Sequence, residues 1–228
     1  MKQSLILIFL FLISANADKV VYKANEVPSK MTVKVKKERF YALLVPAVDK
    51  VYKELFLKYK NIELDIKKSR NLFNIDLLKH KYKVQSDEEL LMVLKPHPQS
   101  IVLAQAAMES AWATSRFFRE ANNVFGMWSV NKNEPRIAAG KKRAGRRTIW
   151  LRKFSTIDES IHAYYFLMAR AGAYKEFRAL RLKTDDPYLL VKKLDKYSEI
   201  GDKYGEELAQ MIRYNKLVKY DNNKLSLN

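Results

Sequence analysis

The 228-residue chain contains no cysteine and only three histidines, with six residues each of glycine and proline. Without cysteine the protein forms no disulfide and carries no lipid on a thiol, although an exported protein is free to form disulfides. His80, His97 and His162 are scattered and lack the spacing of metal ligands. No glycine-rich loop suits a phosphate group. We therefore expect no metal and no cofactor.

Long hydrophobic runs are also missing, except at the N-terminus. Leu5–Ile13 is uniformly apolar, follows a lysine at position 2, and precedes the small-x-small triplet Ala15–Ala17. This pattern predicts a secretory signal peptide over residues 1–17, cleaved after Ala17. The run is too short to span a bilayer as a permanent helix; an uncleaved anchor is the alternative. We expect an exported protein, periplasmic or associated with the cell envelope, with no stable membrane span after cleavage.

Positive charge dominates the rest of the chain. Forty-three basic residues against 25 acidic residues give a formal net charge of +18, and the basic residues are dense over positions 132–153. A field of this sign concentrates anionic partners. A nucleic acid is one such partner, but the predicted export argues against it, and we expect no nucleic-acid binding. The sequence indicates no oligomeric state.

The apolar fraction of 48% and the aromatic fraction of 12% predict a folded globule with a sizeable core. Polar, lysine-rich residues 18–37 predict an extended arm, and Phe40–Tyr59 has the spacing of a long amphipathic helix. We divide the chain after the signal peptide into an N-terminal arm and helical extension (18–95), one domain (96–220) and a C-terminal tail (221–228).

Most of the remaining pattern is helical. Ser86, and Ser155 or Thr156, precede acidic residues in the arrangement typical of helix N-termini. A short β element is predicted around Thr148–Phe154. The fold class expected from the sequence is mainly α with a small β-lobe.

The most informative stretch is Ser100–Trp128. Ala104, Ala107, Met108 and Ala111 recur at helical spacing and predict a closely packed apolar face, with Glu109 on or beside it. A glutamate set against apolar groups loses hydration, which raises its pKa. A raised pKa is what a general acid needs near neutral pH. The alternative is an ordinary glutamate on a helix surface.

The segment AQAAMESAWATSRFFREANNVFGMW resembles the signature of bacterial peptidoglycan glucosaminidase domains of the glycoside hydrolase family 73 type, most closely their Bax-type branch. Two glycines of the family pattern are Ala111 and Ala113 here, which we interpret as suited to a helix because alanine has the higher helix propensity. Later segments, including YSEIGDKY, extend the resemblance over about Pro96–Leu217.

The resemblance implies a lysozyme-like architecture and an enzyme that hydrolyses the β-1,4 bond after N-acetylglucosamine in peptidoglycan glycan strands. Glu109 falls on the family's catalytic glutamate, whose implied role is to protonate the leaving glycosidic oxygen. Tyr197, which opens YSEIGDKY, is a candidate for positioning substrate or water, and Tyr204, the second aromatic of this segment, is a candidate substrate-binding residue.

The turn that follows the motif helix supplies further candidates for substrate binding. Asparagine amides suit sugar hydroxyls and acetamido groups, and aromatic rings either stack on sugars or pack the turn. For Asn122, a simple helix-ending turn is the competing interpretation. The candidate residues are Asn122, Asn123, Phe125, Gly126 and Trp128.

A second catalytic carboxylate is harder to find. Glu134 is the only acid in residues 129–153, and Trp150 stands near the position where family members often carry a glutamate. Glu134 is therefore a candidate base, with an exposed loop acid as the alternative. A single acid also suffices if the substrate's own acetamido group attacks. A lytic transglycosylase and a non-catalytic wall-binding protein remain alternative functions.

Overall fold

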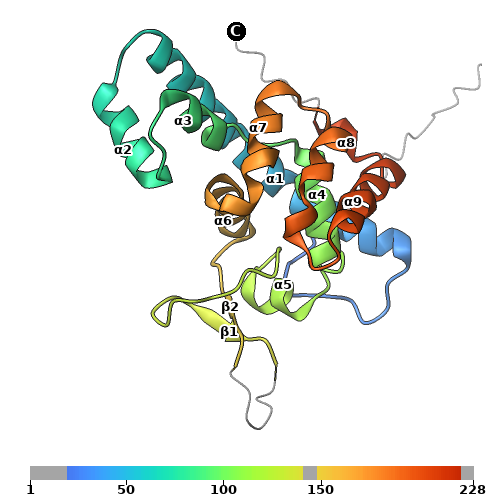
Figure 1. Cartoon of the computed structure of the whole chain (residues 1–228). Coiled ribbons are helices and arrows are strands. Elements are labelled where there is room, and N and C mark those ends of the chain that lie inside the picture. Colours follow the sequence, from blue (N-terminus) through green and yellow to red (C-terminus); the bar gives the residue numbers. More distant parts are fainter. Residues whose placement is uncertain (1–19, 141–147, 222–228) are drawn as a thin grey trace, which may run out of the picture.

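The computed structural model describes residues 20–140 and 148–221. Helices make up most of it, and one short antiparallel pair of strands lies at one end, at the bottom of the view in Figure 1, so the prediction of a mainly α fold with a small β-lobe is confirmed. The predicted signal peptide lies outside the described residues. The elements are α1 (Val33–Lys67), α2 (Leu72–Tyr82), α3 (Asp87–Leu94), α4 (Gln99–Glu109), α5 (Arg116–Ala121), β1 (Arg136–Ala138), β2 (Trp150–Arg152), α6 (Ile157–Arg170), η1 (Gly172–Tyr174), α7 (Lys175–Lys183), α8 (Pro187–Leu190), η2 (Val191–Lys193), η3 (Asp195–Tyr197), α9 (Asp202–Tyr214) and η4 (Leu217–Tyr220).

The long first helix, α1, begins earlier than the sequence predicts. The expectation of an extended arm up to residue 37 is wrong, because the Thr32 hydroxyl accepts a hydrogen bond from the Val35 backbone N–H at 3.2 Å and starts the helix there. A side-chain oxygen in this position satisfies one of the free N–H groups of the first turn. Val33, the first residue of the helix, is 72% exposed.

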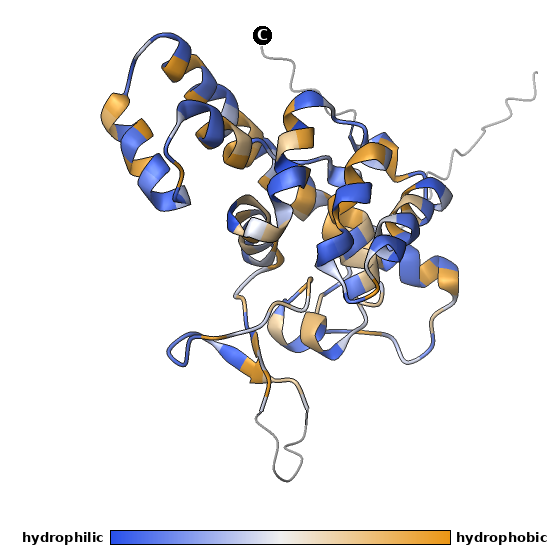
Figure 2. Ribbon diagram, viewed as in Figure 1, coloured by the Kyte–Doolittle hydropathy of each residue, from blue (hydrophilic) through white to orange (hydrophobic). Residues whose placement is uncertain are grey.

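Two groups of buried side chains hold α1 at its two ends. In the first, Phe40, Leu44 and Val48 of α1 are fully buried together with Ile101 and Leu103 of α4. This larger core also includes side chains from α6 and α9, and the apolar colouring of α4 in Figure 2 follows this central position.

The second, smaller core joins the C-terminal part of α1 to α2 and α3, through residues such as Ile62, Leu78 and Leu90. The first part of α1 belongs instead to the larger core, where it packs with α4, the helix that carries the motif.

The predicted helix starts at Ser86 and Thr156 are confirmed. Ser86 forms a complete capping box with Glu89 at the start of α3. The Thr156 hydroxyl accepts a hydrogen bond from the Glu159 N–H at 3.1 Å at the start of α6. Both caps use the pairing of hydroxyl and glutamate that the sequence showed.

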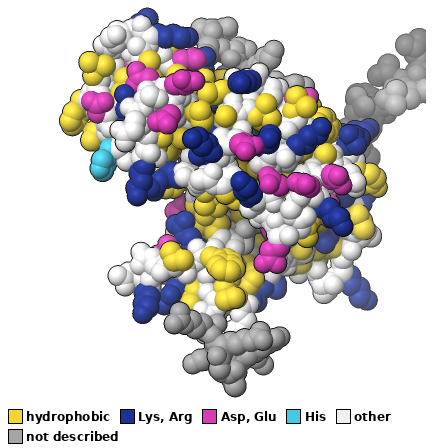
Figure 3. Space-filling model, viewed as in Figure 1, with side chains coloured by type: hydrophobic (Ala, Val, Ile, Leu, Met, Phe, Trp, Pro, Cys, Tyr) yellow, Lys and Arg dark blue, Asp and Glu magenta, His cyan; other side chains and the backbone are white. Residues whose placement is uncertain are grey.

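The β-lobe is built on β2. Ile137 of β1 lies opposite Leu151 of β2, and Trp128 forms a further antiparallel bridge to Leu151. The dense basic segment falls partly on residues 141–147, outside the described part of the chain. Lys and Arg side chains are spread over both the helical part and the lobe in Figure 3. Among residues 20–140 and 148–221, no helix has both the length and the apolarity to cross a bilayer.

Candidate active site

Glu109 is the last residue of α4, at the edge of the main core. The helix before it is lined with small buried residues, among them Ala104, Ala106 and Ala107. Small side chains allow neighbouring elements to approach α4 closely, and Glu109 is half-buried as a result. Burial raises the pKa of Glu109 above its usual range, although a hydrogen bond from Tyr204 acts in the opposite direction. The site therefore has the electrostatic property that the sequence predicted for it.

The backbone turns sharply immediately after Glu109. Ala111, Trp112 and Ala113 have φ angles of 52°, 62° and 61°, all in the left-handed region. The interpretation that Ala111 and Ala113 suit a helix is therefore wrong, because α4 has already ended and the chain needs a conformation that glycine adopts most easily. The glycines of the family pattern fit this turn better than the alanines present here.

Two side chains hold this turn in place. The Ser110 hydroxyl donates to the Ala106 carbonyl and accepts from the Ala113 N–H, at 2.5 and 2.8 Å. The buried guanidinium of Arg39 donates to the Ala113 carbonyl at 2.7 Å and also to the backbone carbonyls of Lys23, Ala24 and Glu26. Arg39 thereby ties the segment before α1 to the turn that follows Glu109.

Two tyrosines from the C-terminal part of the chain cover Glu109. The Tyr204 hydroxyl donates to Oε1 of Glu109 at 2.8 Å, and the Tyr204 side chain is almost fully buried in α9. The ring of Tyr197 in η3 stacks on the Tyr204 ring, with centroids 5.3 Å apart and planes at 10°. Burial and the nearby Glu109 carboxylate raise the pKa of Tyr197 well above its usual range. The structure thus brings three of the sequence-predicted residues together.

The asparagines of the NNVFG turn are bonded to the protein itself. Asn122 ends α5 in the left-handed conformation and donates to the carbonyls of Phe154 and Ser155, at 3.1 Å each. Asn123 is buried, donates to the carbonyls of Met127 and Arg152, and accepts from the Met127 N–H. For Asn122, the helix-ending turn that the sequence left open is what the structure shows. Both side chains fix the turn against the β-lobe.

The other candidates of this segment differ in exposure. Phe125 is buried and stacks on Tyr164, with ring centroids 4.1 Å apart. Gly126 has a φ of +63°, which disfavours other residues there. Trp128 is 69% exposed on the β-lobe. Of these three, Trp128 therefore offers a free aromatic face to a ligand.

Glu134 and Trp150 both lie on the β-lobe and are held by arginines. An oxygen of Glu134 lies 3.2 Å from Nε of Arg152, forming an ion pair. The Arg136 guanidinium lies over the Trp150 ring, 4.4 Å from its centroid. No cluster of three or more His, Cys, Asp or Glu side chains suited to a metal occurs among the described residues.

The sequence did not single out Gln105, which donates from Nε2 to the Tyr204 hydroxyl at 3.2 Å. Gln105 is fully buried. A polar residue within a run of buried alanines was the available signal, because buried polar groups need hydrogen-bond partners.

Residues 89–217, more than half of the chain, match the Glucosaminidase family model, described as mannosyl-glycoprotein endo-beta-N-acetylglucosaminidase. The chain belongs to this family. The resemblance drawn from the motif around Glu109 is thereby confirmed.

Two curated relatives each match about half of the chain. Protein bax of Escherichia coli (strain K12) is 34% identical over 124 residues, covering 52% of this chain and 43% of that protein. Exo-glucosaminidase LytG of Bacillus subtilis (strain 168) is 33% identical over 125 residues, covering 46% of this chain and 43% of that protein. The chain thus spans less than half the length of these two relatives.

A solved structure shares the fold. The catalytic domain of the autolysin Auto from Listeria monocytogenes aligns with a TM-score of 0.52 over 85% of this chain and 92% of that chain, at 16% identity. This likeness confirms the predicted lysozyme-like architecture.

Proposed function

We propose that this glucosaminidase-family domain hydrolyses the β-1,4 bond after N-acetylglucosamine in peptidoglycan glycan strands, with Glu109 as the general acid. The observation that carries the proposal is the environment of Glu109, which is half-buried, has a raised pKa and accepts a hydrogen bond from a neutral tyrosine. A raised pKa increases the protonated fraction of this carboxyl group, and the protonated form is able to donate its proton to a leaving oxygen.

In the proposed reaction, the Glu109 proton passes to the glycosidic oxygen as the bond between that oxygen and the anomeric carbon breaks. Positive charge develops on the sugar ring, and negative charge develops on the Glu109 carboxylate. The Tyr204 hydroxyl, 2.8 Å from Oε1, already donates to the atom that gains this charge. Hydrogen bonds to charged groups are worth about 1.5–3 kcal/mol, so Tyr204 lowers the barrier to proton transfer.

The second step needs a nucleophile at the anomeric carbon. The substrate's acetamido oxygen is one nucleophile, and water activated by a base is another. Tyr197, stacked on Tyr204, is our candidate for positioning the substrate or this water. Glu134 is the candidate base for the water route, and it would have to act beside its partner Arg152.

Substrate contacts are proposed for the turn and the lobe. Trp128 offers an exposed ring for stacking on a sugar. The turn between α5 and the lobe is shaped by Asn122, Asn123, Phe125 and Gly126. We propose that these residues also contact the glycan.

The names of the relatives support this chemistry. LytG is an exo-glucosaminidase and Auto is an autolysin. The sequence pattern of residues 1–17 supports export by a signal peptide, which would place the domain in the cell envelope with its substrate. The net charge of +18 favours glycan strands whose peptide stems carry carboxylates.

The decisive test is digestion of purified peptidoglycan, followed by borohydride reduction and mass spectrometry of the new chain ends. Reduced N-acetylglucosamine ends from the parent protein, absent with Glu109→Gln, are the expected result. Anhydro-muramyl ends would identify a lytic transglycosylase instead. Binding to the sacculus without any new ends would identify a wall-binding protein.

A further inference from the structure

A chain of hydrogen bonds crosses the core and ends on Glu109. It starts at a buried arginine in α7 and uses side chains from α4, α6 and α9, and from the segment between α3 and α4. Its members, in order, are Arg181, His97, Tyr164, Gln105, Tyr204 and Glu109. All of them except Glu109 are buried.

The half of this chain next to Glu109 has clear donors and acceptors. The Tyr164 hydroxyl donates to Oε1 of Gln105, and Nε2 of Gln105 donates to the Tyr204 hydroxyl at 3.2 Å. Tyr204 then donates to Glu109 at 2.8 Å. Each hydroxyl has one proton, so each tyrosine can donate to only one neighbour at a time.

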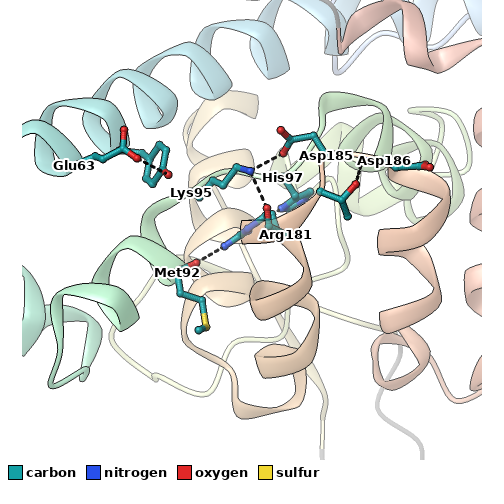
Figure 4. A network of polar contacts seen from close by, with 9 residues as sticks. Glu63, Met92, Lys95, His97, Arg181, Asp185 and Asp186 are labelled. Carbon is teal, nitrogen blue, oxygen red and sulfur yellow. Dashed lines mark hydrogen bonds and ion pairs between the residues drawn. The ribbon is translucent and has the colours of Figure 1, made fainter.

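The far half is fixed by Arg181. Figure 4 shows its guanidinium beside His97 and bonded to the Met92 carbonyl, at 2.7 Å. Nη1 of Arg181 lies 3.5 Å from Nδ1 of His97, and Nε2 of His97 lies 2.8 Å from the Tyr164 hydroxyl. Burial, with Arg181 as a second cause, holds the pKa of His97 well below its usual range, so the imidazole is neutral.

The two ends of the chain determine its direction. Arginine only donates hydrogen bonds, whereas Oε1 of Glu109, the oxygen that Tyr204 faces, accepts one both while the other oxygen holds the acid proton and after that proton has left. Facing Arg181, Nδ1 of His97 must accept, so the ring proton lies on Nε2 and points to Tyr164. Tyr164 then donates to Gln105, and Gln105 in turn donates to Tyr204. The proton of the Tyr204 hydroxyl is left with Glu109 as its acceptor.

We propose that Arg181, His97, Tyr164 and Gln105 are positioning residues. They fix the direction of the Tyr204 hydroxyl, so that it keeps donating its hydrogen bond to Glu109. This inference deepens, and rests on, the proposed role of Glu109 as general acid. Reversal of the chain would turn the Tyr204 proton toward Gln105 and leave the new carboxylate without its donor. The buried arginine thus acts on the reaction through four intervening side chains.

The titratable groups around this chain of hydrogen bonds are mostly tyrosines, with Arg178 and Asp185 near its Arg181 end. Tyr197 of η3 and Tyr204 of α9 face Glu109. Tyr164 interacts with Tyr165 of α6 and Tyr174 of η1, and His97 faces Arg181 of α7. Apart from Glu109 itself, the charged groups therefore lie at the far end, where Arg181 faces Arg178 and Asp185, and Asp185 forms an ion pair with Lys95 at 2.8 Å. Replacement of Arg181 would also change the electrostatic field at Glu109 directly, so the test replaces an uncharged member of the hydrogen-bond chain.

The test compares two substitutions that each remove one buried oxygen from α6. Tyr164→Phe interrupts the chain of hydrogen bonds. Tyr165→Phe removes a hydroxyl that donates to the His97 carbonyl at 3.2 Å and is not part of that chain. The pKa of Glu109 is measured by NMR in protein labelled with ¹³C at glutamate side chains, with Glu109→Gln assigning the signal. We expect Tyr164→Phe to raise this pKa by roughly half a unit or more, part of the value of a hydrogen bond to a charged group. Tyr165→Phe should leave it unchanged.

A double-mutant cycle with Gln105→Leu distinguishes coupling through the hydrogen-bond chain from other effects of the substitutions. With Gln105 replaced, Tyr164 is no longer linked to Tyr204, so adding Tyr164→Phe should cause no further shift. Equal shifts from the two tyrosine variants, no shift from either, or an unchanged effect of Tyr164→Phe in the Gln105→Leu protein would overturn the proposal.

The unsubstituted protein offers a second readout that depends on no variant folding. The ¹⁵N chemical shifts of His97 should show the proton on Nε2, and a proton on Nδ1 would contradict the direction of the chain. Neither NMR measurement uses substrate. A failure of the positioning proposal is therefore distinguishable from a failure to cleave peptidoglycan.

Discussion

The helical part of the molecule carries Glu109 and the β-lobe carries Glu134, and the two glutamates have opposite surroundings. Glu109 is half-buried and accepts from the neutral Tyr204 hydroxyl, and burial raises its pKa. Glu134 lies 3.2 Å from the Arg152 guanidinium in an ion pair. Burial beside neutral groups favours the protonated form of Glu109, from which a proton can be donated. The comparison supports Glu109, and not Glu134, as the proposed proton donor.

The strongest test of this difference is Glu109→Gln, which keeps the shape of the side chain and removes the transferable proton. We expect the rate of glycan cleavage to fall by roughly 10²–10⁴-fold, the usual contribution of general acid catalysis. Release of new reducing ends from peptidoglycan measures the rate. A folded variant that cleaves at the parent rate would show that Glu109 is not the acid.

The same variant should be more stable than the parent near neutral pH. Because the folded-state pKa of Glu109 is raised, the folded protein holds this proton more tightly than the unfolded chain does. Stability of the parent therefore falls as the pH rises from the unfolded pKa through the folded pKa. Glutamine does not titrate, so the advantage of Glu109→Gln should grow with pH over that range. Thermal unfolding at several pH values measures it.

A smaller effect is expected from Tyr204→Phe, which removes the donor to Glu109 and keeps the ring. Without this hydrogen bond the pKa of Glu109 should rise further, since the bond lowers it in the parent. A general acid works only while protonated, so the alkaline limb of the pH–rate profile should move to higher pH. The maximal rate should fall about tenfold, because the new carboxylate loses a charge-assisted hydrogen bond. An unchanged alkaline limb would contradict the assignment.

The turn after Glu109 can be tested by stability. Ala111 is exposed and has a φ of 52°, where a residue with a Cβ is strained by about 1–2 kcal/mol. We expect Ala111→Gly to raise the free energy of unfolding by about 1 kcal/mol, since glycine's greater freedom when unfolded offsets part of the gain. Ala163→Gly, within α6, is the matched control and should lower it by about 1 kcal/mol. Denaturant unfolding of both variants gives the two values, and a loss of stability in both would contradict the strain.

The position of Glu109 was predictable because helical spacing and a specific motif both lie within one short segment. Its contact with Tyr204 joins residues 95 positions apart and depends on how α9 packs on α4. The spacing of apolar residues carries no information about a contact between residues so far apart in the sequence. The motif-based assignment of Tyr204 to the site found the residue but not its hydrogen bond to the acid.

The wrong predictions share a cause. Each rested on the conformational preference of single residues at a place where interactions with other residues determine the backbone conformation. Alanine favours helices, yet at Ala111 and Ala113 the chain must leave the helix to place Glu109 at its end. Valine and lysine alternate over residues 33–36, yet the Thr32 cap starts a helix there. The amide of Asn123 remains a predicted sugar contact, and in this structure it donates to the protein's own backbone.

Glu134→Gln should have the smallest effect of these substitutions. The ion pair with Arg152 lies on a partly exposed lobe, where such pairs contribute about 0–1 kcal/mol, so little stability is at stake. If the substrate's acetamido group is the nucleophile, the rate should change by less than about twofold, because no protein base is needed. Initial rates at saturating and limiting glycan concentrations separate a loss of kcat from a loss of binding. A fall in kcat as large as that of Glu109→Gln would instead make Glu134 the second catalytic carboxylate and remove the contrast between the two halves of the site.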